Sequence, residues 1–303
     1  MGGHAGASVG ATAAALRAWH VASFTSLTAG RDTDDARDVT DAGMEQRAVR
    51  VIDQRDFLGF PAGRLPGIAL HELFERVEFS APLADISSLT AEILTRAGLH
   101  DPAERVSAVS EMAERVLGAT LPEAGFALRE VPRSRTLREW TFHLPLGTVD
   151  GAALSRIFAA HGGELGRRYG PALRRLTGER VHGFLTGVVD LVLEHGGRWY
   201  VVDWKSNHLG HEPESYEPAA LEHEMFASHY VLQYHLYLTA LHRFLRLRLP
   251  GYQYDTHVGG AWYAFLRGID GSERGWFHDL PPRALIDALD ALMESAVPME
   301  AAS

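Results

Sequence analysis

The sequence predicts a mixed α/β domain, in which a central sheet is flanked by helices and carries helical insertions. Apolar residues recur at helical spacing over most of the chain, but alternate or run continuously in a few short segments bounded by turn residues. In order, these segments form a helical region, three strands, a helix and one more strand. The chain has 303 residues, 46% of them hydrophobic, which is enough for one large core with an appendage.

The first 62 residues have the least domain-like composition. They begin with a run rich in glycine and alanine and continue with mixed charges from Arg31 to Asp56. We predict an N-terminal tail and linker over residues 1–62 and a folded domain over residues 63–303. Within the tail, residues 19–27 alternate like a short strand or an anchoring segment.

The first part of the predicted domain is helical. Leu70, Leu73 and Phe74 share one face of a helix that begins near Leu65. Residues 85–118 show the spacing of further helices. We expect these helices to form an all-helical insertion beside the sheet.

Three strands and a second helical stretch follow. Residues 138–144 alternate between polar and apolar side chains, as a strand with one buried face does. Residues 150–177 are rich in helical spacing. Two apolar strands, residues 184–193 and 198–204, are then joined by a loop with two glycines, which is typical of a hairpin.

The C-terminal part completes the predicted layers. Residues 217–248 show the spacing of one long helix, residues 258–266 form a strand, and residues 282–295 form an amphipathic helix. The order of these elements places helices on both sides of a mixed sheet.

Charge and residue usage narrow the function. The net charge of −10 argues against indiscriminate binding to a polyanion, so if DNA is the substrate we expect another component to deliver it. The chain has no cysteine, which leaves any metal to histidine and carboxylates. No stretch approaches the roughly 20 apolar residues of a membrane helix, and no signal peptide opens the chain, so we expect a cytoplasmic protein without a membrane partner.

The strongest chemical signal is Lys205, the single lysine beside 28 arginines. Asp203 lies two residues before it on the same face of a strand, and Asp190 lies across the hairpin. Two carboxylates and one ammonium at such a point predict a Mg²⁺ site, at which the lysine positions an attacking water or holds a phosphate. The alternative is a structural ion-pair network, but aspartates in apolar strands are costly without partners.

Four further residues are equivocal from the residues alone. Gln233 and Tyr237, four apart on one helix face, could donate hydrogen bonds to a phosphate or belong to a packing face. His71 could be a ligand or a surface histidine, and Glu139 is open in the same way. Two other sites are excluded: His71-Glu72-Leu73-Phe74-Glu75 lacks the second histidine of a zinc peptidase, and no Gly-x-x-x-x-Gly-Lys-Ser/Thr loop is present.

Together these segments resemble the PD-(D/E)xK nucleases, and within that family the RecB-type group. The resemblance covers about residues 60–295. Five segments carry it in order: residues 65–75, 183–192, 203–210, 232–245 and 265–270. It implies a restriction-endonuclease-like core, and residues 19–27 are similar to the region that joins helicase to nuclease in that group.

The resemblance also implies roles for individual residues. His71, Asp190 and Asp203 would bind Mg²⁺ together with the backbone carbonyl of Trp204. Lys205 would be the catalytic lysine. The acidic position that supports catalysis matches Glu139, and the accessory helix motif matches Gln233 and Tyr237.

The function implied is Mg²⁺-dependent hydrolysis of DNA phosphodiester bonds, of the exodeoxyribonuclease V type, in DNA end processing and recombinational repair. The ATPase region of that group has no counterpart here. The chain is accordingly a detached nuclease that joins a separate helicase, a fragment of a larger protein or a remnant of a truncated gene, and the sequence leaves these three open. We expect single-stranded ends to be supplied by RecC-like and RecD-like subunits and a separate helicase piece. Two alternatives are a non-catalytic nuclease-fold module that docks on helicase subunits or DNA, and a restriction-type endonuclease.

Overall fold

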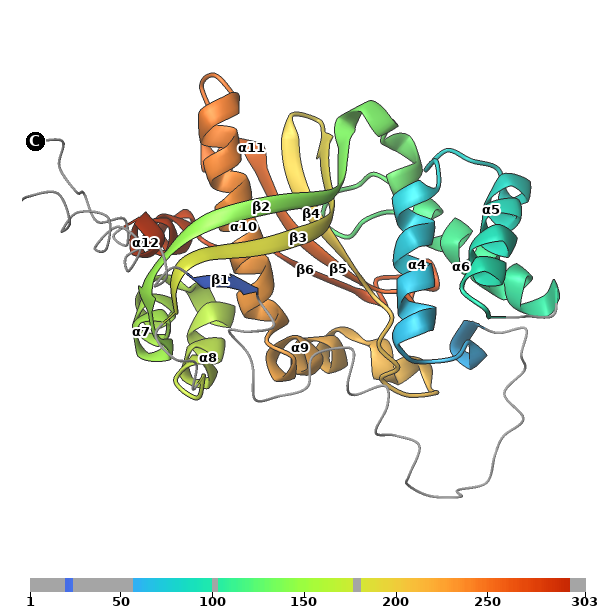
Figure 1. Cartoon of the computed structure of the whole chain (residues 1–303), viewed down its shortest axis with the longest axis horizontal. Helices are drawn as coiled ribbons and strands as arrows, with labels where there is room; N and C mark the ends of the chain where they lie inside the picture. The colour runs from blue at the N-terminus through green and yellow to red at the C-terminus, as the bar shows by residue number, and fades with distance from the viewer. Residues whose placement is uncertain (1–19, 24–56, 100–102, 177–180, 295–303) are drawn as a thin grey trace, which may run out of the picture.

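A computed structural model of the protein describes residues 20–23, 57–99, 103–176 and 181–294. Its centre is a six-stranded sheet in the order β1-β3-β4-β5-β6, with β2 paired to β3 (Figure 1). The strands are β1 (His20–Ser23), β2 (Thr136–Val149), β3 (Val181–His195), β4 (Arg198–Lys205), β5 (Val258–Phe265) and β6 (Trp276–Asp279). Parallel pairs (β1 with β3, β4 with β5) alternate with antiparallel ones, which confirms the predicted mixed sheet.

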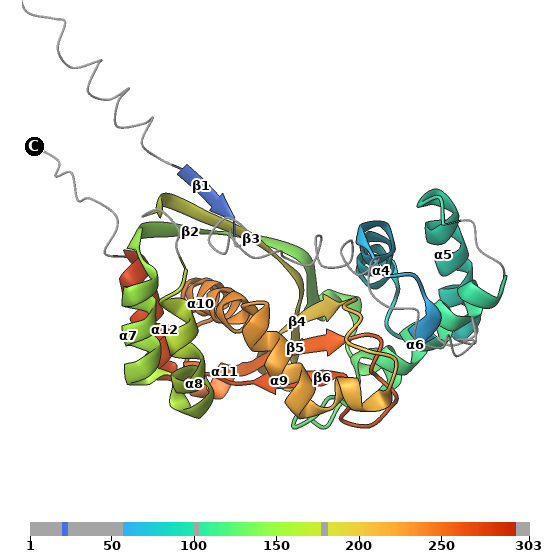
Figure 2. The same ribbon diagram turned by 90° about the horizontal axis from the view of Figure 1, so that it is seen from below.

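Helices flank this sheet on two sides. The first group contains α4 (Arg64–Arg76), α5 (Leu83–Arg96) and α6 (Ala103–Gly118). The second contains α7 (Gly151–His161), α8 (Gly163–Leu173), α9 (Pro218–Ala227), α10 (Tyr230–Arg248), α11 (Tyr254–His257) and α12 (Arg283–Glu294). Four short 3-10 helices span Phe57–Gly59, Leu128–Glu130, Arg133–Arg135 and Pro213–Tyr216. In Figure 2 the first group stands beside the sheet, as the predicted helical insertion does.

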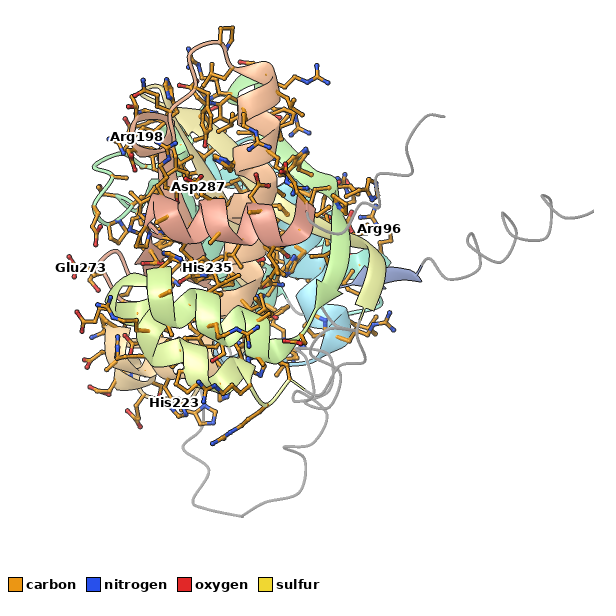
Figure 3. All side chains as sticks on the ribbon, turned by 90° about the vertical axis from the view of Figure 1, so that its left-hand side faces the viewer. Arg96, Arg198, His223, His235, Glu273 and Asp287 are labelled. Atoms are coloured by element: carbon orange, nitrogen blue, oxygen red, sulfur yellow. The ribbon has the colours of Figure 1, made fainter. Side chains whose placement is uncertain are left out.

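Two apolar cores lie on opposite faces of the sheet. On the α10 face, Val201 and Phe265 pack with the side chains of α7, α8 and α12. Figure 3 views the molecule from the side on which α7, α8 and α12 lie, with α12 crossing in front of α10. On the other face, Val202 and Trp204 pack with α4, α5 and α6. Alternate residues of β4 therefore serve different cores, as the period of a strand requires.

The edge of β3 is divided between two partners. β1 pairs in parallel with β3 at residues 183–186, whereas β4 pairs with β3 only at residues 191–195. The strand predicted within residues 19–27 is thus present, as β1. The hairpin between β3 and β4 closes at Gly196 and Gly197, both with positive φ (59° and 82°), as a tight two-residue turn requires.

β2 and β3 bend together at one point, which Figure 2 shows as a turn of both ribbons. Val189 packs in the α10 core and Leu191 in the opposite core, although two residues of a regular strand share one face. The pairing of β2 with β3 skips Glu139 and Asp190, which lie between the pairs Arg138–Leu191 and Trp140–Val189. Glu139 has φ of 50°, a left-handed conformation that costs about 1–3 kcal/mol in a residue other than glycine.

Three sequence-based expectations about elements need correction. The helix predicted over residues 217–248 is two helices, because His229 adopts a left-handed conformation (φ 58°) and its ring accepts a hydrogen bond from the Tyr169 hydroxyl or donates one to it (2.7 Å). β6 was not predicted, since four residues are too few for a clear alternation. β2 is twice as long as the alternation at residues 138–144 indicates.

The end of the predicted linker packs onto the domain through Arg267. This buried guanidinium donates to the backbone carbonyls of Phe60 (2.8 Å) and Pro61 (3.0 Å), and to that of Ser206 (2.9 Å). Phe57 and Phe60 are buried and stack on each other. Residues 57–61 are thereby held beside the loop that follows β4.

Among the described residues, none of the helices combines the length and apolarity needed to cross a membrane. The remaining residues of the predicted tail lie outside the described part of the chain.

Candidate active site

β3 and β4 separate at the point where the predicted carboxylates gather. Their pairing ends at Leu191 and Val202. The residues beyond this point are Asp190 on β3 and Asp203 on β4. The backbone N–H of Trp204 donates across the fork to Oδ2 of Asp190 at 2.8 Å. Both carboxylates are therefore held at the fork between β3 and β4.

α4 and the bend in β2 add two more groups to this point. Nδ1 of His71, on α4, lies 3.3 Å from Oδ1 of Asp190. One ligand atom from each of His71, Glu139 and Asp190 lies within 4.8 Å of the other two. These three residues were predicted from the sequence, in which the first and the last are 119 positions apart. In the structure they converge into one group of atoms that could bind a metal.

Asp203 is not part of this group of three, because it pairs with Lys205. Both side chains are buried, and Nζ of Lys205 lies 2.9 Å from Oδ2 of Asp203. Nζ also donates to Oε1 of Gln233 on α10 at 3.4 Å. The ammonium lies 3.9 Å from the centroid of the Tyr230 ring and 5.3 Å from that of Tyr263. Lys205 is thus held by a carboxylate, an amide and two aromatic faces.

Gln233 and Tyr237 occupy different surroundings on α10. The Tyr263 hydroxyl donates to Oε1 of Gln233 at 2.8 Å, so this amide oxygen joins Tyr263 to Lys205. The Tyr237 ring packs edge-on against Phe142, with centroids 5.7 Å apart. Burial, and after it the charge of Asp203, raises the pKa of the Tyr237 hydroxyl. Tyr237 is therefore neutral and lies within electrostatic reach of the site.

The ionisable groups of the site perturb one another. Burial disfavours the His71 imidazolium, but the Asp190 carboxylate outweighs burial and raises the pKa of His71 to about 9. Burial opposes ionisation of Asp190, yet His71 and the Trp204 N–H hold its pKa below the usual value. Burial raises the pKa of Asp203 to about 7 although Lys205 opposes it. Burial and Asp190 also raise the pKa of Glu139.

The position of α4 is fixed at two points near the site. The Trp204 indole is buried on the opposite face of β4 and stacks on Phe74 of α4, with ring centroids 4.4 Å apart. Nη1 of Arg138, the neighbour of Glu139, donates to the carbonyls of Glu75 (2.7 Å) and Val77 (2.6 Å) at the end of α4. These contacts set His71 on α4 at a defined distance from both strands.

A pocket of about 530 Å³ opens above this group. It is bounded by residues along the length of α4, from Arg64 to Glu75, on one side and by β2 and β3 on the other. Its lining residues are Gly63, Arg64, Gly67, Ile68, His71, Glu72, Glu75, Glu139, Val188, Asp190 and Ser206. The candidate ligands therefore face a space that can admit a substrate.

Sequence reasoning missed three residues of this arrangement: Tyr230, Tyr263 and Arg138. Tyr230 lies three positions before Gln233, so helical spacing could have placed both on one face. Tyr263 pairs with Asp203 across β4 and β5, which depends on a strand order that the sequence does not contain. The role of Arg138 depends on where α4 ends in space.

The donor set indicates what the site can bind. Carboxylate oxygens and an imidazole nitrogen suit a hard or intermediate divalent cation, and the described ligand atoms include no sulfur. The three groups bring more negative than positive charge to one point, and a cation relieves this imbalance. The residues thus fit a divalent metal.

Comparison with known proteins agrees with this donor set. The sequence model of the PD-(D/E)XK nuclease superfamily matches residues 49–297. The chain belongs to this superfamily. The predicted family and its restriction-endonuclease-like core are thereby confirmed, and nucleases of the PD-(D/E)XK superfamily use divalent metals.

Three curated relatives carry the same name. The chain is 35% identical over 238 residues to the RecBCD enzyme subunit RecB of Escherichia coli (strain K12), which covers 77% of the chain and 19% of that protein. It is 31% identical over 294 residues to RecB of Haemophilus influenzae, which covers 90% of the chain and 23% of the relative. It is 32% identical over 325 residues to RecB of Mycolicibacterium smegmatis, which covers 93% of the chain and 30% of the relative. The chain is thus a RecB-type nuclease module that spans less than a third of these relatives.

Proposed function

We propose that this chain is a Mg²⁺-dependent deoxyribonuclease of the exodeoxyribonuclease V type. The observation that carries the proposal is the junction of two clusters at the β3–β4 fork. One is the group of His71, Glu139 and Asp190, and the other is the buried pair of Asp203 and Lys205. The backbone N–H of Trp204 joins them through Asp190.

His71, Asp190 and Asp203 are the proposed side-chain ligands of the metal, with the backbone carbonyl of Trp204 as a fourth. Their chemistry fits Mg²⁺, which prefers oxygen ligands and keeps part of its water shell. A bound Mg²⁺ would supply Lewis acidity toward the phosphate and a water of lowered pKa. Glu139, the third member of the ligand-atom group, would bind or orient a water in the same shell.

Lys205 is the proposed catalytic residue for the attacking water. A lysine ammonium is a compact charge whose protons rotate freely, so it can hold a water or a phosphate oxygen while its stem stays fixed. Gln233 and the Tyr230 ring keep the ammonium at the site. Tyr237, neutral and buried beside these groups, would donate its hydroxyl proton as a hydrogen bond.

The proposed substrate is single-stranded DNA at an end, in DNA end processing and recombinational repair. A chain of net charge −10 gains little from general attraction to a polyanion, so we propose that partners deliver the strand. The curated relatives are RecB subunits of a RecBCD enzyme. RecC-like and RecD-like subunits and a separate helicase piece are the partners that we propose by analogy.

The test is digestion of an end-labelled linear single strand by the purified chain with Mg²⁺ or with Ca²⁺. We expect products with Mg²⁺ only, and none from the Lys205→Ala variant. Full Mg²⁺-dependent cleavage by that variant would contradict the role of Lys205. If the wild-type chain cleaves nothing, alone or with partner subunits, the proposal fails and the chain is better described as a docking module.

A further inference from the structure

Two large apolar side chains are exposed at the pocket that holds the metal-ligand group. Ile68 on α4 is 52% exposed and Val188 on β3 is 42% exposed. Both line the pocket, together with His71, Glu139 and Asp190. We refer to Ile68 and Val188 as the apolar rim.

Their exposure is uncommon in this protein. Among the described residues only six large hydrophobic side chains are exposed. They are Leu65, Ile68, Leu83, Val188, Leu247 and Leu280. Two of the six border one pocket from different elements, and Leu65 lies one turn before Ile68 on α4. Apolar groups left in water around a polar site mark a surface that contacts a ligand.

The charges of the pocket divide it into two zones. The ligand-atom group of His71, Glu139 and Asp190 provides the zone in which a metal attracts a phosphate. The carboxylate of Glu72 is bound by Arg76 at 3.0 Å and also by Arg96, so it adds little repulsion. The apolar rim offers no partner to a phosphate, and it suits the uncharged part of a nucleotide.

We propose that the apolar rim packs against the bases of a single DNA strand next to the scissile phosphate. This inference rests on the proposed nuclease function and assigns the substrate its contact surface. A volume of about 530 Å³ lies in the range of small-molecule sites, which is the size class of a nucleotide. The rim therefore orients the strand while the phosphate lies at the metal-ligand group.

The rim selects single strands because of what each form of DNA exposes. In a duplex the apolar faces of the bases are covered by stacking, and only their edges and the sugar-phosphate backbone are accessible. In a single strand the bases unstack and can pack on protein side chains without regard to sequence. Aliphatic contacts from Ile68 and Val188 act on the faces of bases of any identity.

The test uses the double variant Ile68→Ser with Val188→Ser. Both side chains are exposed, so the substitutions remove contact surface without opening the core. Binding to a fluorescein-labelled oligothymidylate is measured by fluorescence anisotropy, and KM and kcat are measured by cleavage with Mg²⁺. We expect Kd and KM to rise about fivefold with kcat unchanged, since uniform binding is lost.

An abasic strand of the same length provides the decisive comparison. It keeps the phosphates and lacks the bases, so we expect the double variant to bind it as tightly as the wild type does. The matched control is Leu247→Ser, at an 81% exposed position of α10 outside the pocket. This variant should bind both strands as tightly as the wild type does. A blunt duplex should show no difference between the double variant and the wild type.

Three results would overturn the proposal. The first is that the double variant binds oligothymidylate as tightly as the wild type does. The second is that its binding to oligothymidylate and to the abasic strand is weakened equally, and the third is that its binding to the duplex is weakened as much as its binding to the single strand. The anisotropy measurement does not depend on cleavage. A wild-type chain that binds strands through the rim and cuts none would refute the proposed catalysis and leave the rim supported.

Discussion

Two charged clusters in this protein differ in their balance of charge. Between α10 and α12, Arg243 and Arg246 both bind the buried carboxylate of Asp290, and Arg246 also reaches Glu294. At the fork of β3 and β4, Asp190 lies beside His71 and Glu139, and Asp203 pairs with Lys205.

The difference separates a cluster that joins two helices from the proposed metal site. In the α10–α12 cluster two guanidinium groups neutralise two carboxylates, and the pairs tie two helices together. In the fork cluster the carboxyl groups of Glu139 and Asp190 share one histidine, His71, whose positive charge is stabilised by Asp190. Carboxylates that gather at one point repel one another, and a bound cation relieves this repulsion.

The largest effect is expected at the fork. Lys205→Arg keeps a positive charge beside Asp203 and the aromatic rings, but the planar guanidinium cannot take the place of a compact ammonium. We expect cleavage to fall about 10³-fold for both Lys205→Arg and Lys205→Ala, in the range of a lost proton-handling group. Circular dichroism of Lys205→Arg should match the wild type. Retained cleavage by the arginine variant would show that any cation suffices.

The opposite result is expected for the structural cluster. Asp290→Ala removes the carboxylate that Arg243 and Arg246 share and leaves a partly buried guanidinium without its partner. We expect the free energy of unfolding to fall by about 3 kcal/mol in urea, with cleavage per folded molecule unchanged. A loss of kcat in excess of the loss of folded protein would show that this cluster also serves the reaction.

A buried histidine on α10, His235, makes the free energy of unfolding depend on pH. Burial lowers the pKa of His235 to about 3, and its Nδ1 lies 2.6 Å from the carbonyl of Val231. In the unfolded chain this histidine takes up a proton near pH 6.5, whereas in the folded chain it stays neutral down to about pH 3. The free energy of unfolding is therefore unaffected by this histidine above pH 6.5 and decreases as the pH falls from 6.5 toward 3. We expect His235→Leu to flatten the loss of stability between pH 6.5 and pH 4 by about 1.4 kcal/mol per pH unit. Equal slopes in variant and wild type would contradict the neutral state of His235.

The smallest effect is expected at the Tyr230 ring, which lies beneath the Lys205 ammonium. Tyr230→Leu removes the aromatic face 3.9 Å from Nζ of Lys205, whereas Tyr230→Phe keeps it. We expect kcat to fall about tenfold in the leucine variant with KM unchanged, and to recover in the phenylalanine variant. Equal losses in both variants would assign the role to the hydroxyl, which bonds Asn207 at 3.2 Å.

Sequence periodicity predicted those parts of the fold that depend on local order. The helix of His71 and the strands of Asp190 and Lys205 follow from apolar spacing. The break before α10 does not, because it depends on a contact between His229 and Tyr169, 60 positions apart. The left-handed conformation of Glu139 is likewise sustained by the bend of two strands. The domain boundary at residues 62 and 63 stays a prediction.

The candidate site shows the same division. Asp203 and Lys205 could be paired by strand alternation alone, and the structure places them 2.9 Å apart. His71 was equivocal until a family resemblance favoured it, because its partner Asp190 is 119 positions away. No periodicity indicates that the Tyr230 ring lies beneath the ammonium. Roles that depend on tertiary packing require the structure.

The central claim is that the fork cluster binds a divalent cation and the α10–α12 cluster does not. The most direct measurement is titration of the chain with Mn²⁺, followed by the loss of the free-ion signal in electron paramagnetic resonance, for the wild type, Asp190→Asn and Asp290→Asn. Mn²⁺ accepts the same oxygen ligands as Mg²⁺. We predict binding by the wild type and by Asp290→Asn, and binding weakened at least about tenfold in Asp190→Asn. Equal binding by all three proteins would contradict the account.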